Sequence, residues 1–273
     1  MKNILRVLGA SFYMLLSLFV LVPSYAYADL TITPTRVVFE DGDRFSHVTL
    51  VNSTQRTNTY EIKWQYFKMR EGGGAAYEAV EASVTDFDLA QHVVYTPRRV
   101  TIAPSGKQKV RLALRRPAEV PPGEYRAHLT FSSVPDDLSD EDSKSEKMSV
   151  GVRVNVGFSI PIVFQAGKSD VQANIDSVLL ERNPDSGMLE AIIKVDRSGG
   201  PYGVLGYLYI YNTKGEVLGE VSNANIFPEV NSRTFRVPLT NEDLSGGSIT
   251  VSLKHVEKER QYTYAERSFP VQQ

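Results

Sequence analysis

The chain has 273 residues, of which 42% are apolar and 23% charged, a formal net charge of −2 and no cysteine. This composition is typical of a globular protein and excludes a disordered or fibrous one. Without cysteine the chain has no disulfides, thiolate-bound zinc, iron–sulfur cluster or thiol nucleophile. The slightly negative net charge argues against nucleic-acid binding through a broadly basic surface.

The N-terminus has the layout of a secretory signal peptide. Lys2 and Arg6 precede a 16-residue, nearly uncharged apolar run at positions 7–22, and Ala26-Tyr27-Ala28 forms a small-x-small cleavage site. The run is shorter than the ~20 residues that span a bilayer, so cleavage after Ala28 is favoured over an uncleaved membrane anchor. We therefore expect an exported mature chain that begins at Asp29 and resides in the periplasm.

Period-two alternation, rather than helical periodicity, runs through the rest of the chain. In the first half, strands are predicted at residues 30–32, 37–39, 47–52, 60–67, 93–102, 108–114 and 125–131. In the second half, strands are predicted at residues 173–180, 189–195, 204–211, 216–221, 234–239, 249–254 and 261–267. Each half has its own set, separated by turn residues. The prediction is an all-β protein with two immunoglobulin-like β-sandwich domains, residues 29–166 and 167–273.

One segment departs from ordinary strand length. Every even position from Met148 to Phe164 is apolar, which gives an apolar stripe that includes Val150, Val152, Val154, Val156, Phe158 and Ile160. Strands in globular domains usually have 3–10 residues, so one sandwich core does not cover the whole stripe. Two consecutive core strands, or one strand that crosses between the domains, would explain it. We favour a strand that completes the sheet of a partner through main-chain hydrogen bonds and alternate side chains.

The segment before the stripe fits this interpretation. Residues 134–147 contain six acidic residues and two lysines, which is typical of a long solvated loop. Such a loop would leave the start of the following strand free to move.

No catalytic, metal or cofactor site is predicted. The four histidines have no metal-ligand spacing and are interpreted as surface or sheet residues: His47, His92, His128 and His255. The glycines at 72–74 lack the Lys-Ser/Thr of a phosphate-binding loop. Trp64 is expected in a core. A basic run is expected to face solvent, with a contact to a partner protein as the alternative: Lys107, Lys109, Arg111, Arg115 and Arg116.

Several motifs occur together in a specific order. They are PTRVVF at 34–39, YTP at 95–97 followed by V-x-I-x-P-x-G-x-x-x-VRL at 100–112, EYRA-x-L at 124–129, and then the apolar stripe. In this order and spacing the chain resembles the periplasmic chaperones of the chaperone–usher pathway, the PapD-like family that assembles pili and fimbriae. The segment DRSGGPYG at 196–203 resembles the second domain of that family.

The resemblance implies two immunoglobulin-like domains in an L or boomerang arrangement. It implies donor-strand complementation, in which the long strand lends apolar side chains to a pilus subunit that lacks its last strand. The partners would be pilus or fimbrial subunits and an outer-membrane usher, with no ATP and no cofactor. The resemblance is also compatible with a homodimer of the client-free chain in which the exposed strand is capped.

Family members also bind the C-terminal carboxylate of their client with two basic residues in the interdomain cleft. Arg36 matches the first of these, with an exposed surface arginine as the alternative. The second is usually a lysine late in the long strand, and that position falls near Pro161, with Ser159 as neighbour. Neither residue is basic, so the resemblance leaves the second cation unassigned.

Two other functions are alternatives to this one. A structural pilus-associated protein would carry its alternation in a free N-terminal extension, whereas here the stripe is internal and precedes a second domain. A periplasmic glycan-binding module would need an exposed aromatic platform, for which the candidates are Tyr202, Tyr207, Tyr209 and Tyr211. Tyrosines at period two are more often ordinary strand residues.

Overall fold

The structure is a computed structural model that describes residues 29–71, 77–85, 87–134, 157–257 and 260–271. The predicted signal peptide and Val150, Val152, Val154 and Val156 of the stripe lie outside the described residues. No helix in the described part of the chain is long and apolar enough to cross a membrane.

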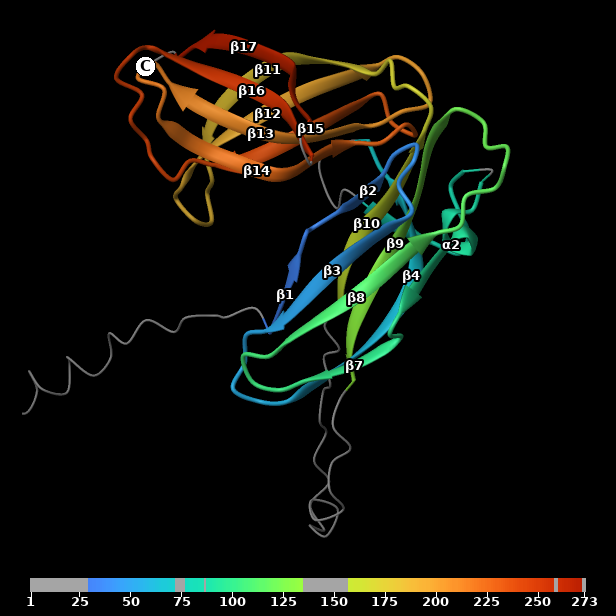
Figure 1. Cartoon of the computed structure of the whole chain (residues 1–273). Coiled ribbons are helices and arrows are strands. Elements are labelled where there is room, and N and C mark those ends of the chain that lie inside the picture. Colours follow the sequence, from blue (N-terminus) through green and yellow to red (C-terminus); the bar gives the residue numbers. More distant parts are fainter. Residues whose placement is uncertain (1–28, 72–76, 86, 135–156, 258–259, 272–273) are drawn as a thin grey trace, which may run out of the picture.

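The first half of the chain folds into a sandwich of two sheets (Figure 1). One sheet is antiparallel, in the order β1 (Leu30–Thr33), β3 (Phe45–Asn52), β8 (Lys107–Leu114) and β6 (Val93–Thr96). The other has the order β2 (Val37–Phe39), β10 (Gly157–Ala166), β9 (Gly123–Val134), β4 (Asn58–Met69) and β5 (Tyr77–Val80), and β7 (Arg99–Ile102) also pairs with β4. A short helix, α2 (Leu89–His92), precedes β6.

The second half forms another sandwich. Its smaller sheet has the order β11 (Gln172–Arg182), β12 (Leu189–Ser198) and β15 (Ser232–Pro238). Its larger sheet has the order β14 (Val217–Ile226), β13 (Val204–Asn212), β16 (Ser248–Glu257) and β17 (Arg260–Pro270). Figure 1 shows this sandwich lying across one end of the first, so that the two make an L. The predicted all-β fold of two sandwiches is confirmed.

Each sandwich encloses an apolar core that follows the alternation in the sequence. In β8, Val110 and Leu112 are buried while Lys109 and Arg111 are exposed, as expected for a strand with one face on the core. Trp64 is half-buried at the margin of the first core, with its ring against Tyr95. The second core also includes three residues of the first sandwich, Val38, Met69 and Val163, so the two cores meet at the junction.

The predicted strand at 93–102 is wrong in one respect. The structure divides it into β6 and β7, which belong to different sheets. Pro97 lies between them and has no N–H to donate to a ladder, so the chain leaves one sheet there and enters the other. The sequence also did not predict β5 or α2, each only four residues long.

Candidate functional site

The N-terminal half of β10 is an unpaired strand edge. On one side β10 pairs with β9 along its whole length, from Gly157 opposite Ser132 to Ala166 opposite Gly123. On the other side its only ladder among the described residues is with β2, and it covers just Ile162 to Phe164. Residues 157–161 therefore present a free edge in the described structure.

The described part of the stripe packs into the core of the first sandwich. Ile160, Ile162 and Phe164 are buried in that core, and half-buried Phe158 packs against it. The interpretation as a core strand therefore holds for Phe158 and Ile160, the two residues of the predicted donor strand that the structure describes. Any part of the stripe without a place in this core must lie further toward the N-terminus.

The opposite face of the same sheet is covered by the second sandwich. In β9, the inward side chains of Tyr125, Ala127 and Leu129 enter the first core, while Glu124, Arg126 and His128 alternate with them and are also buried. Sequence alternation alone would place such polar residues in solvent. Burial on both faces marks this end of the sheet as the junction between the sandwiches.

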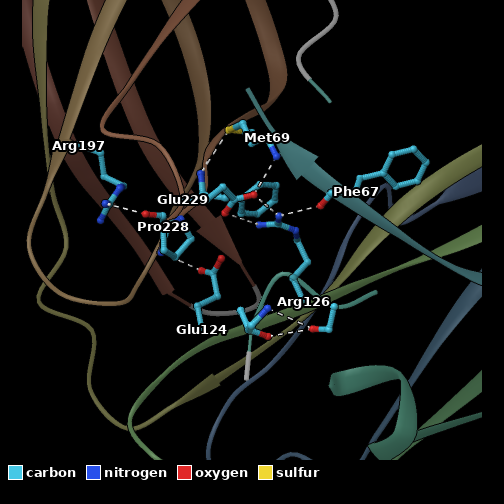
Figure 2. Close-up of polar contacts among 11 residues, drawn as sticks. Phe67, Met69, Glu124, Arg126, Arg197, Pro228 and Glu229 are labelled. Carbon is cyan, nitrogen blue, oxygen red and sulfur yellow. Dashed lines mark hydrogen bonds and ion pairs between the residues drawn. The ribbon is translucent and has the colours of Figure 1, made fainter. Parts of the chain in front are cut away.

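Arg126 forms the central polar contact of the junction (Figure 2). Its guanidinium makes an ion pair with Glu229, donates to the Phe67 carbonyl at 3.2 Å, and lies 3.5 Å from the centre of the Phe227 ring. Glu229 also accepts a hydrogen bond from the backbone N–H of Met69 at 2.9 Å. Arg126 is almost completely buried, so this pair ties the segment around residue 229 to β4 and β9.

Glu124 makes a second link across the junction. One oxygen of its carboxylate accepts hydrogen bonds from the Gly203 N–H at 3.0 Å and from the Gln165 side chain at 3.2 Å. A Cβ atom at position 203 would lie 2.8 Å from the other carboxylate oxygen, so only glycine permits this approach. Burial raises the pKa of Glu124. The contact explains one glycine of the DRSGGPYG segment.

Arg36 is buried, so the alternative of an exposed surface arginine is wrong. It lies just before β2, and its Nη1 atom donates to the Asn225 side chain at 2.7 Å. The guanidinium also lies over the ring of Tyr207, 5.1 Å from its centre. Both partners belong to the second sandwich, so the second sandwich covers this segment of the first.

A cavity of about 330 Å³ opens between the two sandwiches beside Arg36. Its lining comes from both of them and consists of Thr35, Phe67, Tyr77, His128, Ser159, Pro161, Asn223, Asn225 and Arg233. The position near Pro161, where the resemblance places a second base, is thus in this cavity.

The cation that lines the cavity is Arg233, from β15 of the second sandwich. Its Nη1 atom donates to the backbone carbonyl of Asn225 at 2.7 Å, while Arg36 donates to the side chain of the same residue. Two guanidinium groups from different sandwiches therefore converge on Asn225. The sequence did not single out Arg233, because the contact joins strands of separate sandwiches.

His128 faces the same cavity as a neutral side chain. Burial, and then the nearby charge of Arg126, lower the pKa of His128 to about 3. Its Nδ1 atom is buried and has no hydrogen-bond partner among the described residues. The imidazole therefore adds a polar surface to the cavity at neutral pH but no charge.

The tyrosines proposed for a glycan platform are not exposed. Tyr202 is buried and its hydroxyl donates to the Ala166 carbonyl at 2.7 Å. Tyr207, Tyr209 and Tyr211 are half-buried on one face of β13. Across the described ranges, no three His, Asp or Glu side chains are placed to hold a metal ion.

No family model and no curated protein matches the chain. Similar solved structures include a chain of the CsuC–CsuE chaperone–tip adhesion subunit complex of the archaic chaperone–usher Csu pili of Acinetobacter baumannii, with 15% identity over 88% of this chain and 98% of that one, at a TM-score of 0.44. The CupB2 chaperone of Pseudomonas aeruginosa is 13% identical over 87% and 98% of the two chains, with a TM-score of 0.41. A chain of the Salmonella enterica SafA pilin–SafB chaperone complex is 8% identical over 91% and 99%, with a TM-score of 0.44.

Proposed function

We propose that the chain is a periplasmic chaperone of the chaperone–usher type. It binds pilus or fimbrial subunits by donor-strand complementation and delivers them to an outer-membrane usher without ATP. The observation that carries the proposal is the free edge of β10 at residues 157–161. The apolar alternation of the sequence continues upstream of that edge, through Val156 to Val150.

The apolar stripe would supply both the main-chain groups and the side chains that recognise a partner strand. Main-chain groups along an edge pair with a partner strand, and alternate side chains enter the pockets of its sheet. Even positions of an extended strand share one face, so Val150 to Val156 would continue the face of Ile160. A partner's open core would then extend the core of the first sandwich. Each buried valine contributes roughly 1.5–3 kcal/mol before the costs of ordering.

The cavity between the two sandwiches would hold the C-terminal end of the client chain. Guanidinium groups bind carboxylates through two parallel hydrogen bonds, and Arg36 and Arg233 meet at Asn225 beside the cavity. We assign the client's C-terminal carboxylate to this pair. In this assignment Arg233 takes the place of the base that the resemblance puts near Pro161.

The stripe is tested by co-purification of the mature chain with exported immunoglobulin-like proteins from periplasm. Wild type is expected to retain a small subunit, and Val152→Glu/Val154→Glu to lose it, because the two carboxylates would enter an apolar groove. Ser149→Glu/Asn155→Glu is the matched control, with the same charge change at odd positions of the segment. Equal retention by both variants would refute donation of the even face. Trp64 fluorescence and circular dichroism verify that each variant is folded.

The assignment of the client's carboxylate to Arg36 and Arg233 is tested with the variant Arg233→Gln. This variant is expected to bind the captured subunit about 10- to 100-fold more weakly, as for loss of one charged hydrogen-bonded contact. Arg236→Gln is the control, since Arg236 lies on the same strand with an exposed side chain and does not line the cavity. Isothermal titration gives both dissociation constants. If the two variants bind alike, Arg233 does not bind the client.

A further inference from the structure

The outer face of the sheet formed by β1, β3, β8 and β6 has no partner in the described structure. It lies on the side of the first sandwich that does not contain β10 (Figure 1). The exposed residues of β8 on this face are Lys107, Lys109 and Arg111, and β3 adds His47 next to Arg111. The face is therefore basic, although the whole chain has a net charge of −2.

The strand register divides this face into an apolar row and a basic region. Ala113 has Phe45 of β3 opposite it on one side and Val94 of β6 on the other. Phe45 is 79% exposed and Val94 41%, and both are among the most exposed large apolar residues described. The next row along the strands contains His47 and Arg111, followed by Lys109 and then Lys107. Apolar and basic side chains are thus segregated along the strands.

The charge on this face has a single sign. The outward positions of β1, β3, β8 and β6 contain no Asp or Glu. Among the described residues, no carboxylate lies within ion-pair distance of Lys107, Lys109 or Arg111, whereas Lys194, Lys214 and Arg182 of the second sandwich each have one. Beyond the apolar row, exposed Arg115 follows the end of β8. At that end of the face Asp43 lines the same hollow as Phe45 and Arg115. The cations without an acidic neighbour among the described residues are therefore Lys107, Lys109 and Arg111.

We propose that this face binds the surface of a membrane that contains anionic phospholipid. Lys107, Lys109 and Arg111 would contact lipid phosphates, and Phe45 would enter the interface between headgroups and acyl chains. Exposed apolar residues beside basic ones are the arrangement by which interfacial segments bind anionic lipid. An acidic protein surface would match the cations but would leave Phe45 unexplained. The proposal does not depend on the chaperone function, and a strand paired to the β10 edge would leave this face free.

The test is co-sedimentation of the mature chain with vesicles of equal parts phosphatidylglycerol and phosphatidylcholine, compared with phosphatidylcholine alone. Binding is expected only to the anionic vesicles and should be lost in about 1 M salt, where the screening length falls to about 3 Å. Lys107→Gln/Lys109→Gln/Arg111→Gln should weaken binding at least tenfold. Arg182→Gln/Lys194→Gln/Arg236→Gln removes the same charge from the second sandwich and should bind as wild type does.

A spectroscopic variant tests insertion independently of the charge variants. The only tryptophan, Trp64, is packed against Tyr95, so Phe45→Trp would add an exposed fluorophore. Its emission should shift to the blue with anionic vesicles and stay unchanged with neutral ones. No binding to anionic vesicles, or equal loss of binding in both triple variants, would overturn the proposal. Binding of the wild type to polyglutamate but not to the vesicles would also overturn it and assign the face to an acidic protein.

Discussion

Replacing Arg126 with leucine is expected to lower the free energy of unfolding by about 3–5 kcal/mol, because a buried carboxylate then loses its counter-ion. Arg126 is buried, and its partner Glu229 lies at the junction with only 15% of its side chain exposed. The substitution also removes the guanidinium from above Phe227 and from the Phe67 carbonyl. The contacts with Glu229 and Phe227 join the two sandwiches, so the unfolding of the sandwiches should become less coupled as well.

Two probes distinguish these effects during urea unfolding. Trp64 is the only tryptophan and reports on the first sandwich, while far-ultraviolet circular dichroism reports on the strands of both. In wild type the two transitions should coincide, and in Arg126→Leu they should separate. Adding Glu229→Gln should recover part of the lost stability, because it removes the unpaired charge.

An exposed ion pair provides the control for Arg126. Arg182 and Glu242 lie 3.1 Å apart with about half of each side chain exposed, and such pairs contribute at most about 1 kcal/mol. Arg182→Leu should therefore change the free energy of unfolding only slightly. If Arg126→Leu were no worse than Arg182→Leu, the junction would not depend on the buried pair.

The strands and the two sandwiches could be predicted because they depend on local alternation. In β8, for example, Val110 and Leu112 alternate with Lys109 and Arg111, and the structure buries the first pair and exposes the second. The division between β6 and β7 was harder to predict from the sequence, since the apolar positions continue on both sides of Pro97. Alternation measures which face is apolar, and it does not say to which sheet a strand belongs.

The junction could not be predicted from the sequence in the same way. Glu124, Arg126 and His128 occupy the positions that alternation assigns to solvent, and their burial depends on a second sandwich far along the chain. The resemblance to chaperone–usher chaperones draws attention to Arg36, but the contact of Arg36 with Asn225 and the convergence of Arg233 on that residue are seen only in the structure. The apolar stripe has a related ambiguity, because period two is the same for a strand in its own core and in a partner's core.

Acid is expected to destabilise the chain through His128, by about 2–3 kcal/mol between pH 6.5 and pH 4.5. Burial and the charge of Arg126 lower the pKa of His128 to about 3 in the folded chain, against 6.5 for an ordinary histidine. Below pH 6.5 the unfolded chain therefore binds a proton that the folded chain does not. The stabilisation is complete above pH 6.5 and is lost progressively as the pH falls toward 3.

Glu124 acts in the opposite direction, so the test compares variants rather than absolute stabilities. Burial raises the pKa of Glu124, and the folded chain therefore gains stability as the pH falls through that raised pKa toward the ordinary value. His128→Gln should remove the acid-sensitive contribution and flatten the fall in urea-unfolding free energy, while Glu124→Gln should steepen it. His47→Gln replaces an exposed histidine and should leave the profile of wild type unchanged. If His128→Gln and His47→Gln gave the same profile, His128 would not be the source of the acid sensitivity.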